Sequence, residues 1–394
     1  MFLYGAYLLM EVIHYQSSFF PAINESNERN HIMPAVRTIK FLHRTVIIAP
    51  LYLLFFIVVL LLDLGIETLH DFFIVHIVFA LLLSYATAHL VRGLLFFFGR
   101  WVVTRTSSKF SSEKQLNRYR ECKQISYCSE EKSEHIVLLL HGFTTSSMDW
   151  NILANRLQEE HVDFYAPLLT GFGLIRQNPI LSIHKEEWFR QVIDIYDLFA
   201  DRYKTISVIG HSMGGMLACY LAEHRPVHEL MISAPALFPQ KQHRFYSRVI
   251  KNKLLSTYIS WQIPMIPKLS RSGRSGPADT MDTKSTYQYF QYLIVPIRLL
   301  FAMLQAQTEI KLDKMMYKRL TLMYGKHDIT VNNPAIEDFI QSCDMPFQRF
   351  IFGDSAHNIF VDFDREQVNN LVISLLTNTF TQEMKNQYNY ECYS

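Results

Sequence analysis

A serine near the middle of the chain stands in a sequence context typical of an enzymatic nucleophile. Ser212 is the centre of Gly210-His211-Ser212-Met213-Gly214, a G-x-S-x-G pattern between the apolar segment ISVIG and a helix predicted over 213–224. Between a strand and a helix, this pattern places the serine on a strained turn, because side chains at 210 and 214 would collide with neighbouring backbone. The hydroxyl then lies at a helix N-terminus, whose partial positive charge favours attack on a carbonyl.

A serine hydroxyl is a weak nucleophile at neutral pH and needs a base, whose tautomer a third group must fix. His357 and Asp328 qualify because each follows a predicted strand, in GDSAHNIF and GKHDITV respectively. The carboxyl ends of parallel strands meet at one edge of a sheet, so both side chains are expected beside Ser212. We therefore predict Ser212 as nucleophile, His357 as base and Asp328 as orienting acid. Competitors that are less well placed relative to the strands are His211, His327, Asp354 and Asp362.

Attack on a carbonyl creates an oxyanion, which preorganised N–H donors stabilise by a few kcal/mol. The first predicted donor is the backbone N–H of Met213, the residue after the nucleophile. The second is the N–H of Phe143, in the sequence His141-Gly142-Phe143-Thr144 after a predicted strand. Gly142 permits the turn, and His141 is expected to hydrogen-bond within this loop rather than to catalyse.

The elements that must position these residues follow from the apolar pattern. Continuous apolar strands alternate with amphipathic helices, which indicates a parallel sheet covered on both faces; right-handed crossovers make this a doubly wound α/β domain. The predicted strands are 136–140, 163–167, 206–210, 229–233, 320–325 and 347–353, with an irregular first strand near 125–127. The predicted helices are 149–159, 186–203, 213–224 and 364–379.

Four segments, HGFTTSSMDW, GHSMGG, GKHDITV and GDSAHNIF, resemble the successive signatures of the α/β-hydrolase superfamily. Within it they are most similar to small thermostable bacterial carboxylesterases and monoglyceride lipases of the serine aminopeptidase-like branch. The resemblance covers about residues 135–380. It implies a serine hydrolase of carboxylic esters, a carboxylesterase or a monoacylglycerol-type lipase, that forms an acyl-enzyme on Ser212. In this fold the insertion at about 239–315 holds a cap over the site.

Two uncharged apolar runs, 45–62 and 72–91, precede this domain. Each is long enough to cross a hydrocarbon core of about 30 Å as a helix, and neither has a polar face at helical spacing. Basic residues flank the pair and acidic residues fill the connecting loop. The basic flanks include Arg37, Lys40, Arg44, Arg92, Arg100 and Arg105, and the loop holds Asp63, Glu67 and Asp71. Because basic flanks stay in the cytoplasm, we expect a two-pass integral membrane protein with a cytoplasmic catalytic domain.

The chain thus divides into an N-terminal segment (1–44), two transmembrane helices (45–98), a polar linker (99–134), the catalytic domain (135–380) and a C-terminal tail (381–394).

The beginning of the cap is basic, from Lys241 to Arg274, with no acidic residue until Asp279 and with apolar residues at helical spacing. Two interpretations stay open for it: a helix lying on an anionic membrane leaflet, or a solvated basic face.

Other functions could use the same fold. Acyl transfer is one alternative, because His357 and Asp362 match the H-x4-D spacing proposed for some acyltransferases. Peptidase activity is less favoured because nothing marks a site for a peptide amino terminus. A non-catalytic interaction module is also less favoured, because such proteins usually lose a member of the triad and none is missing here.

The sequence predicts no cofactor, no metal site and no nucleic-acid partner, because it has no phosphate-binding loop, metal-ligand spacing or nucleic-acid motif. The partners that it predicts are an ester or lipid-derived small molecule and membrane lipid; it identifies no protein partner. The five cysteines are odd in number and lack CxxC spacing, which suits a reducing compartment.

Overall fold

The computed structural model describes residues 122–130, 133–173, 183–237, 292, 294–342 and 345–393, with short pieces at 256–257, 260, 265–267 and 280–282 and single residues between 78 and 90. None of the helices in these ranges is long and apolar enough to cross a membrane. The N-terminal segment, almost all of the two apolar runs and most of the basic stretch at 241–274 lie outside the described residues. The membrane hairpin and the interfacial helix therefore stay predictions.

The predicted sheet is confirmed. Within the described residues its eight strands run in the order β1 (Ile125–Tyr127), β3 (Asp163–Ala166), β2 (His135–Leu140), β4 (Thr205–His211), β5 (Val227–Ser233), β8 (Tyr317–Gly325), β9 (Phe347–Phe352) and β10 (Asn389–Tyr393). The six central strands are parallel, and β1 and β10 are antiparallel edge strands. The carboxyl ends of β4, β8 and β9 consequently lie at the same edge of the sheet.

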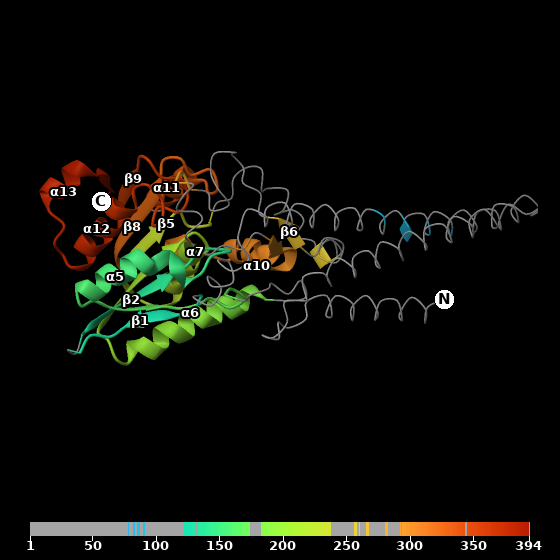
Figure 1. The fold of residues 1–394 in the computed structure, drawn as a ribbon, viewed down its shortest axis with the longest axis horizontal. Coiled ribbons are helices and arrows are strands. Elements are labelled where there is room, and N and C mark those ends of the chain that lie inside the picture. Colours follow the sequence, from blue (N-terminus) through green and yellow to red (C-terminus); the bar gives the residue numbers. More distant parts are fainter. Residues whose placement is uncertain are drawn as a thin grey trace, which may run out of the picture.

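Helices cover both faces of this sheet (Figure 1). The helices α6 (Lys185–Ala200), α7 (Met213–His224) and α11 (Asn333–Ser342) cover one face, and α5 (Asn151–Glu159) and α12 (Arg365–Leu376) cover the other. Each predicted helix is present, although α6 and α12 each end three residues early and a 3-10 turn at Ser147–Trp150 precedes α5.

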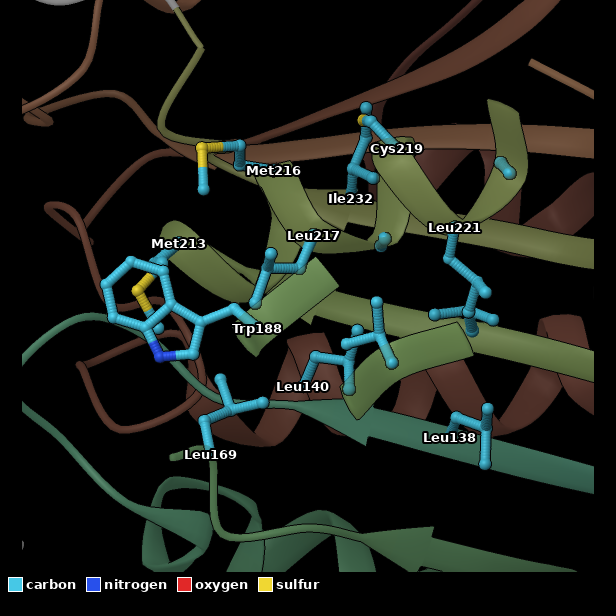
Figure 2. Packing of buried hydrophobic residues seen from close by; sticks show 14 of the residues in the cluster. Leu138, Leu140, Leu169, Trp188, Met213, Met216, Leu217, Cys219, Leu221 and Ile232 are labelled. Carbon is cyan, nitrogen blue, oxygen red and sulfur yellow. The ribbon is translucent and has the colours of Figure 1, made fainter. Parts of the chain in front are cut away.

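The strand β2 shows how the sequence produces two cores. Its side chains alternate between the faces, as the period of a strand requires. Ile136, Leu138 and Leu140 join the core beneath α6 and α7, part of which Figure 2 shows, and Val137 and Leu139 join the core beneath α5 and α12. All five are at most 1% exposed. A strand buried on both faces must be apolar throughout, which is why it reads as one continuous apolar run.

The sheet extends into the region predicted to be a C-terminal tail. Residues 381–394 contain the short helix α13 (Gln382–Gln387) and β10, which pairs with β9. The Tyr393 ring stacks on Phe347, with centroids 4.7 Å apart and planes 10° apart. The pattern of β10 is too short and polar to be identified as a strand by itself, because its stability comes from pairing and from this cross-strand aromatic contact.

The described parts of the insertion between β5 and β8 include a two-stranded sheet, the helix α10 and a 3-10 turn at Leu312–Lys314. The strands β6 (Met265–Pro267) and β7 (Ile294–Pro296) pair antiparallel, and α10 (Ile297–Gln307) follows directly and contacts α6. Before them, the Tyr292 N–H donates to the Thr144 carbonyl at 2.9 Å. The insertion is thus attached to the loop after β2, beside the edge at which β4 ends.

Candidate active site

The turn between β4 and α7 holds Ser212 in a strained conformation, with φ of 53° and ψ of −114°. A Cβ atom at Gly210 would lie 2.3 Å from the Gly214 carbonyl oxygen, and one at Gly214 would lie 1.9 Å from the Leu140 oxygen. Such distances exclude any side chain, so the close packing of α7 on β2 and β4 requires glycine at both positions, as the sequence predicted.

Hydrogen bonds to neighbouring backbone hold this turn in place. The Ser212 N–H donates to the Ser233 carbonyl at 2.9 Å, and the Ser212 carbonyl accepts from Met216 at 3.0 Å and Ala236 at 2.9 Å. A residue with positive φ costs free energy that the surrounding structure must offset. These bonds connect the turn to β5 and α7, so the hydroxyl is presented from a fixed position.

The structure brings Ser212, His357 and Asp328 together although their strands are far apart in the sequence. His357 Nε2 lies 2.9 Å from Ser212 Oγ, and His357 Nδ1 lies 3.0 Å from Asp328 Oδ2. The residues Ser212 and His357 are 8% and 7% exposed, and the Asp328 side chain is 1% exposed. The arrangement is a continuous hydrogen-bonded chain from hydroxyl to carboxylate, shielded from water.

The environment of Asp328 keeps its carboxyl group charged. Burial alone would raise its pKa, but the facing His357 and hydrogen bonds from Asn333 and Thr330 outweigh burial and hold the pKa below its usual value. Oδ1 accepts the Thr330 and Val331 N–H groups at 2.8 and 3.2 Å. An ionised carboxylate accepts a hydrogen bond from Nδ1–H, which favours the His357 tautomer whose unprotonated Nε2 faces the serine hydroxyl.

Asn333 is a site residue that sequence reasoning missed. Its Nδ2 donates to Asp328 Oδ2 at 2.8 Å, the same oxygen that faces His357. The asparagine occurs as the first residue of α11. No pattern in the sequence distinguishes it, because its contact depends on the path of the loop between β8 and α11.

The competing histidines and carboxylates occupy other places. His327 and Asp354 are exposed. The His211 ring is buried, with Nδ1 3.3 Å from Ser233 Oγ and its centroid 4.9 Å from that of His357. The Asp362 carboxylate accepts hydrogen bonds from backbone N–H groups.

Among the described residues, no group of three or more His, Cys, Asp or Glu side chains is placed to bind a metal ion.

The loop after β2 lies against the turn that carries Ser212. The Gly142 carbonyl accepts from His141 Nδ1 at 2.9 Å and from Thr145 Oγ1 at 3.0 Å. A trans peptide directs the Phe143 N–H opposite to that carbonyl. A Cβ atom at Gly142 would lie 3.5 Å from Ser212 Cβ, so this loop closely approaches Ser212.

His141 has the structural role that the sequence predicted. Its Nε2 accepts the Leu169 N–H at 3.0 Å, so Nδ1 carries the proton that is donated to Gly142. Burial lowers the pKa of His141 to about 4, which keeps the ring neutral at physiological pH.

Met213 is the first residue of α7, where N–H groups have no intrahelical acceptor. The N–H groups of Phe143 and Met213 thus lie in the two segments that border Ser212.

Comparison with known proteins identifies relatives of this chain. A family model described as serine aminopeptidase, S33, matches residues 131–364. A carboxylesterase of Bacillus subtilis (strain 168) is 28% identical over 115 residues, which are 29% of this chain and 46% of that protein. A thermostable monoacylglycerol lipase of Bacillus sp. (strain H-257) is 36% identical over 90 residues, 23% of this chain and 36% of that protein. The chain therefore aligns with less than half the length of either relative.

Solved structures share the fold. The monoacylglycerol lipase of Paleococcus ferrophilus superposes with a TM-score of 0.53 at 17% identity, covering 65% of this chain and 98% of that one. A thermostable carboxyl esterase from Bacillus coagulans superposes with a TM-score of 0.54 at 16% identity, covering 65% and 93%. Since the family model spans more than half of the sequence, this chain belongs to the serine aminopeptidase S33 family and adopts the α/β-hydrolase fold, as its motifs predicted.

Proposed function

We propose that this protein is a membrane-anchored serine hydrolase that cleaves carboxylic esters. The observation that carries the proposal is the chain of two hydrogen bonds, of 2.9 and 3.0 Å, that joins Ser212 through His357 to Asp328. A hydroxyl so placed has a general base within reach, and that base has a fixed tautomer. The relatives named carboxylesterase and monoacylglycerol lipase support an ester as the substrate.

In the proposed reaction His357 removes the proton of Ser212 as Oγ attacks the ester carbonyl carbon. The N–H groups of Phe143 and Met213 stabilise the oxyanion of the tetrahedral intermediate. Collapse of this intermediate breaks the bond to the alcohol, which takes the proton from His357 and leaves an acyl group on Ser212. Water then attacks the acyl carbon, gives its proton to His357 and releases the acid; the proton returns to the serine.

Membrane anchoring is the second part of the proposal. It is supported by the two apolar runs with basic flanks, and by large apolar side chains exposed on described helical residues of the second run. Val78, Tyr85 and Leu90 are 41%, 42% and 55% exposed. Apolar side chains on the outside of a helix suit lipid contact. A cytoplasmic catalytic domain attached in this way would meet lipid-derived esters, such as monoacylglycerols, at the membrane surface.

The test combines labelling with a substrate series. Wild-type protein and Ser212→Ala are treated with a fluorophosphonate probe, and turnover is measured on p-nitrophenyl esters of increasing acyl length. Labelling of the wild type at Ser212, its absence in the variant and measurable ester turnover are the expected results. Labelling at a different serine would refute the nucleophile. A wild type that is labelled but turns over none of the esters would refute the substrate class.

A further inference from the structure

Asp362 is a buried carboxylate that the reaction itself does not use. It is 0% exposed, and four backbone N–H groups donate to it. Oδ2 accepts from Met281 and Ala356, both at 2.8 Å. Oδ1 accepts from Asp282 at 2.7 Å and from Phe363 at 2.9 Å. A carboxylate offers about four acceptor positions, and bonds from N–H groups to a charged oxygen are stronger than those to a neutral one.

These four donors belong to two segments that are distant in the sequence. Ala356 and Phe363 lie in the loop that follows β9, and Ala356 directly precedes His357. Met281 and Asp282 lie in the insertion between β5 and β8, 81 and 80 residues away from Asp362. The carboxylate therefore connects the insertion to the backbone that carries His357.

Two further contacts support this connection. Arg365 Nη1 lies 2.9 Å from Oδ2 of Asp282, which belongs to the insertion. The same nitrogen donates to the Asp362 carbonyl at 3.1 Å. On the other side of His357, Asp364 Oδ2 accepts from the Asp354 N–H at 2.9 Å and from Ser355 Oγ at 2.8 Å. The loop around His357 is thus fixed on both sides of the histidine and also to the insertion.

We propose that Asp362 is a positioning residue that aligns His357 with Ser212 by holding the loop after β9 against the insertion. This inference rests on the proposed hydrolase function. It also assigns a role to the H-x4-D spacing between His357 and Asp362: the acceptor positions of the carboxylate are filled by backbone N–H groups, so they do not bind an acyl-accepting alcohol. Asp362 thereby affects the attack on the ester and not the choice between water and alcohol in the second step.

The experiment compares Asp362→Asn with the full-length wild type in detergent. The amide keeps one acceptor oxygen but turns an NH2 group toward N–H donors, which displaces the loop. A displacement of about 1 Å costs on the order of 100-fold in rate, so we expect kcat on p-nitrophenyl butyrate to fall by about 10- to 100-fold with KM changed by less than about threefold. The matched control is Asp354→Asn, which changes an exposed carboxylate of the same loop and should leave kcat unchanged.

Fluorophosphonate labelling distinguishes positioning from instability. Misalignment slows the labelling rate of Asp362→Asn, but every molecule is labelled in the end. An unchanged rate with a smaller labelled fraction would mean that Asp362 only stabilises the fold and would overturn the proposal. With glycerol present, the ratio of glyceryl butyrate to butyrate should equal that of the wild type; selective loss of transfer would instead make Asp362 an acceptor-binding residue.

A second variant covers the case in which Asp362→Asn does not fold. Arg365→Gln removes the two contacts of Nη1 that join the insertion to the loop after β9, the ion pair to Asp282 and the hydrogen bond to the Asp362 carbonyl, and leaves the Asp362 carboxylate unchanged. Its labelling should be complete and about threefold slower, because the insertion is held less firmly. A wild-type rate in Arg365→Gln would then overturn the proposal. Absence of labelling in the wild type itself would refute the proposed hydrolase function, which is a separate outcome.

Discussion

Asn333 donates a hydrogen bond of 2.8 Å to the Asp328 oxygen that His357 faces at 3.0 Å. The carboxylate is therefore held at both of its oxygens, because the Thr330 and Val331 N–H groups donate to the other one. Rotation of the carboxylate would break at least one of these bonds, so the orientation of the Asp328 side chain toward His357 is fixed.

Asn333→Leu should lower kcat for ester hydrolysis by about tenfold, because one hydrogen bond to a charged group contributes about 1.5 kcal/mol or more. KM should change little, since Asn333 contacts Asp328 and not the substrate. Steady-state kinetics on p-nitrophenyl butyrate check this expectation. Asn332→Ala is the matched control, as the neighbouring side chain has no hydrogen bond to Asp328. Equal losses in both variants would exclude a specific role for Asn333.

Ser212→Ala and His357→Ala should each reduce ester turnover by several orders of magnitude. The two residues act as a unit, since Nε2 lies 2.9 Å from Oγ, so the loss in the double variant should not be the product of the single losses. The measurement is kcat/KM for the three variants and the wild type. If the loss in the double variant equals the product of the two single losses, the two side chains contribute independently.

Gly214→Ala should destabilise the protein by more than about 3 kcal/mol and abolish activity. The new methyl group would lie 1.9 Å from the Leu140 oxygen and 2.7 Å from the His141 oxygen, and these backbone atoms at the end of β2 cannot move aside as a flexible side chain could. Gly353→Ala is the control, because a Cβ atom there meets nothing within 4 Å. Urea unfolding followed by tryptophan fluorescence measures both effects. A Gly214→Ala protein as stable as Gly353→Ala would contradict the packing described for this turn.

Stability should fall as the pH is lowered from 6.5 to 4. Burial lowers the pKa of both His135 and His141 from 6.5 to about 4 in the folded protein. In that interval the unfolded chain binds protons that the folded chain does not, so acid favours unfolding, by about 3 kcal/mol at pH 4 for a fully buried histidine. Asp328 contributes to the loss of stability only at lower pH. The pKa of its carboxyl group is below the usual value in the folded protein, so the charged carboxylate stabilises the fold until the pH falls through that lowered pKa.

Urea unfolding at several pH values tests this expectation, and His135→Gln should flatten the slope between pH 4 and 6.5. The buried rings of Trp150 and Trp188, both 0% exposed, report unfolding by fluorescence. A slope in His135→Gln identical to that of the wild type would show that His135 is protonated equally in the folded and unfolded chains.

The membrane topology can be tested in intact cells. A cysteine in place of Glu67, in the acidic loop between the two apolar runs, should react with an impermeant thiol reagent. Ser394→Cys should not react. The native cysteines Cys128 and Cys392, both exposed, one directly after the edge strand β1 and one in the edge strand β10, are internal controls that should also stay unlabelled. Reaction of Cys392 or Ser394→Cys without reaction at residue 67 would reverse the orientation.

The sequence by itself determined the order along the chain of the six parallel strands and of the helices α5, α6, α7 and α12, and it predicted that Ser212, His357 and Asp328 would meet. Strands buried on both faces must be apolar throughout, and the turn that carries Ser212 must have glycine at 210 and 214, so both leave local patterns. Ser212 and His357 are 145 residues apart, yet their meeting could be predicted, because parallel strands deliver the residues that follow them to one edge of the sheet.

Only the tertiary structure decided how that site is supported. The bond from Asn333 to Asp328 and the four backbone bonds to Asp362 depend on the paths of loops, which have no periodicity in the sequence. The same holds for β10, whose five residues are a strand because β9 offers an unpaired edge and Phe347 offers a ring to stack on. Hydrogen-bond partners are chosen by proximity after folding, so a residue type alone shows that a group can bond but not to which partner.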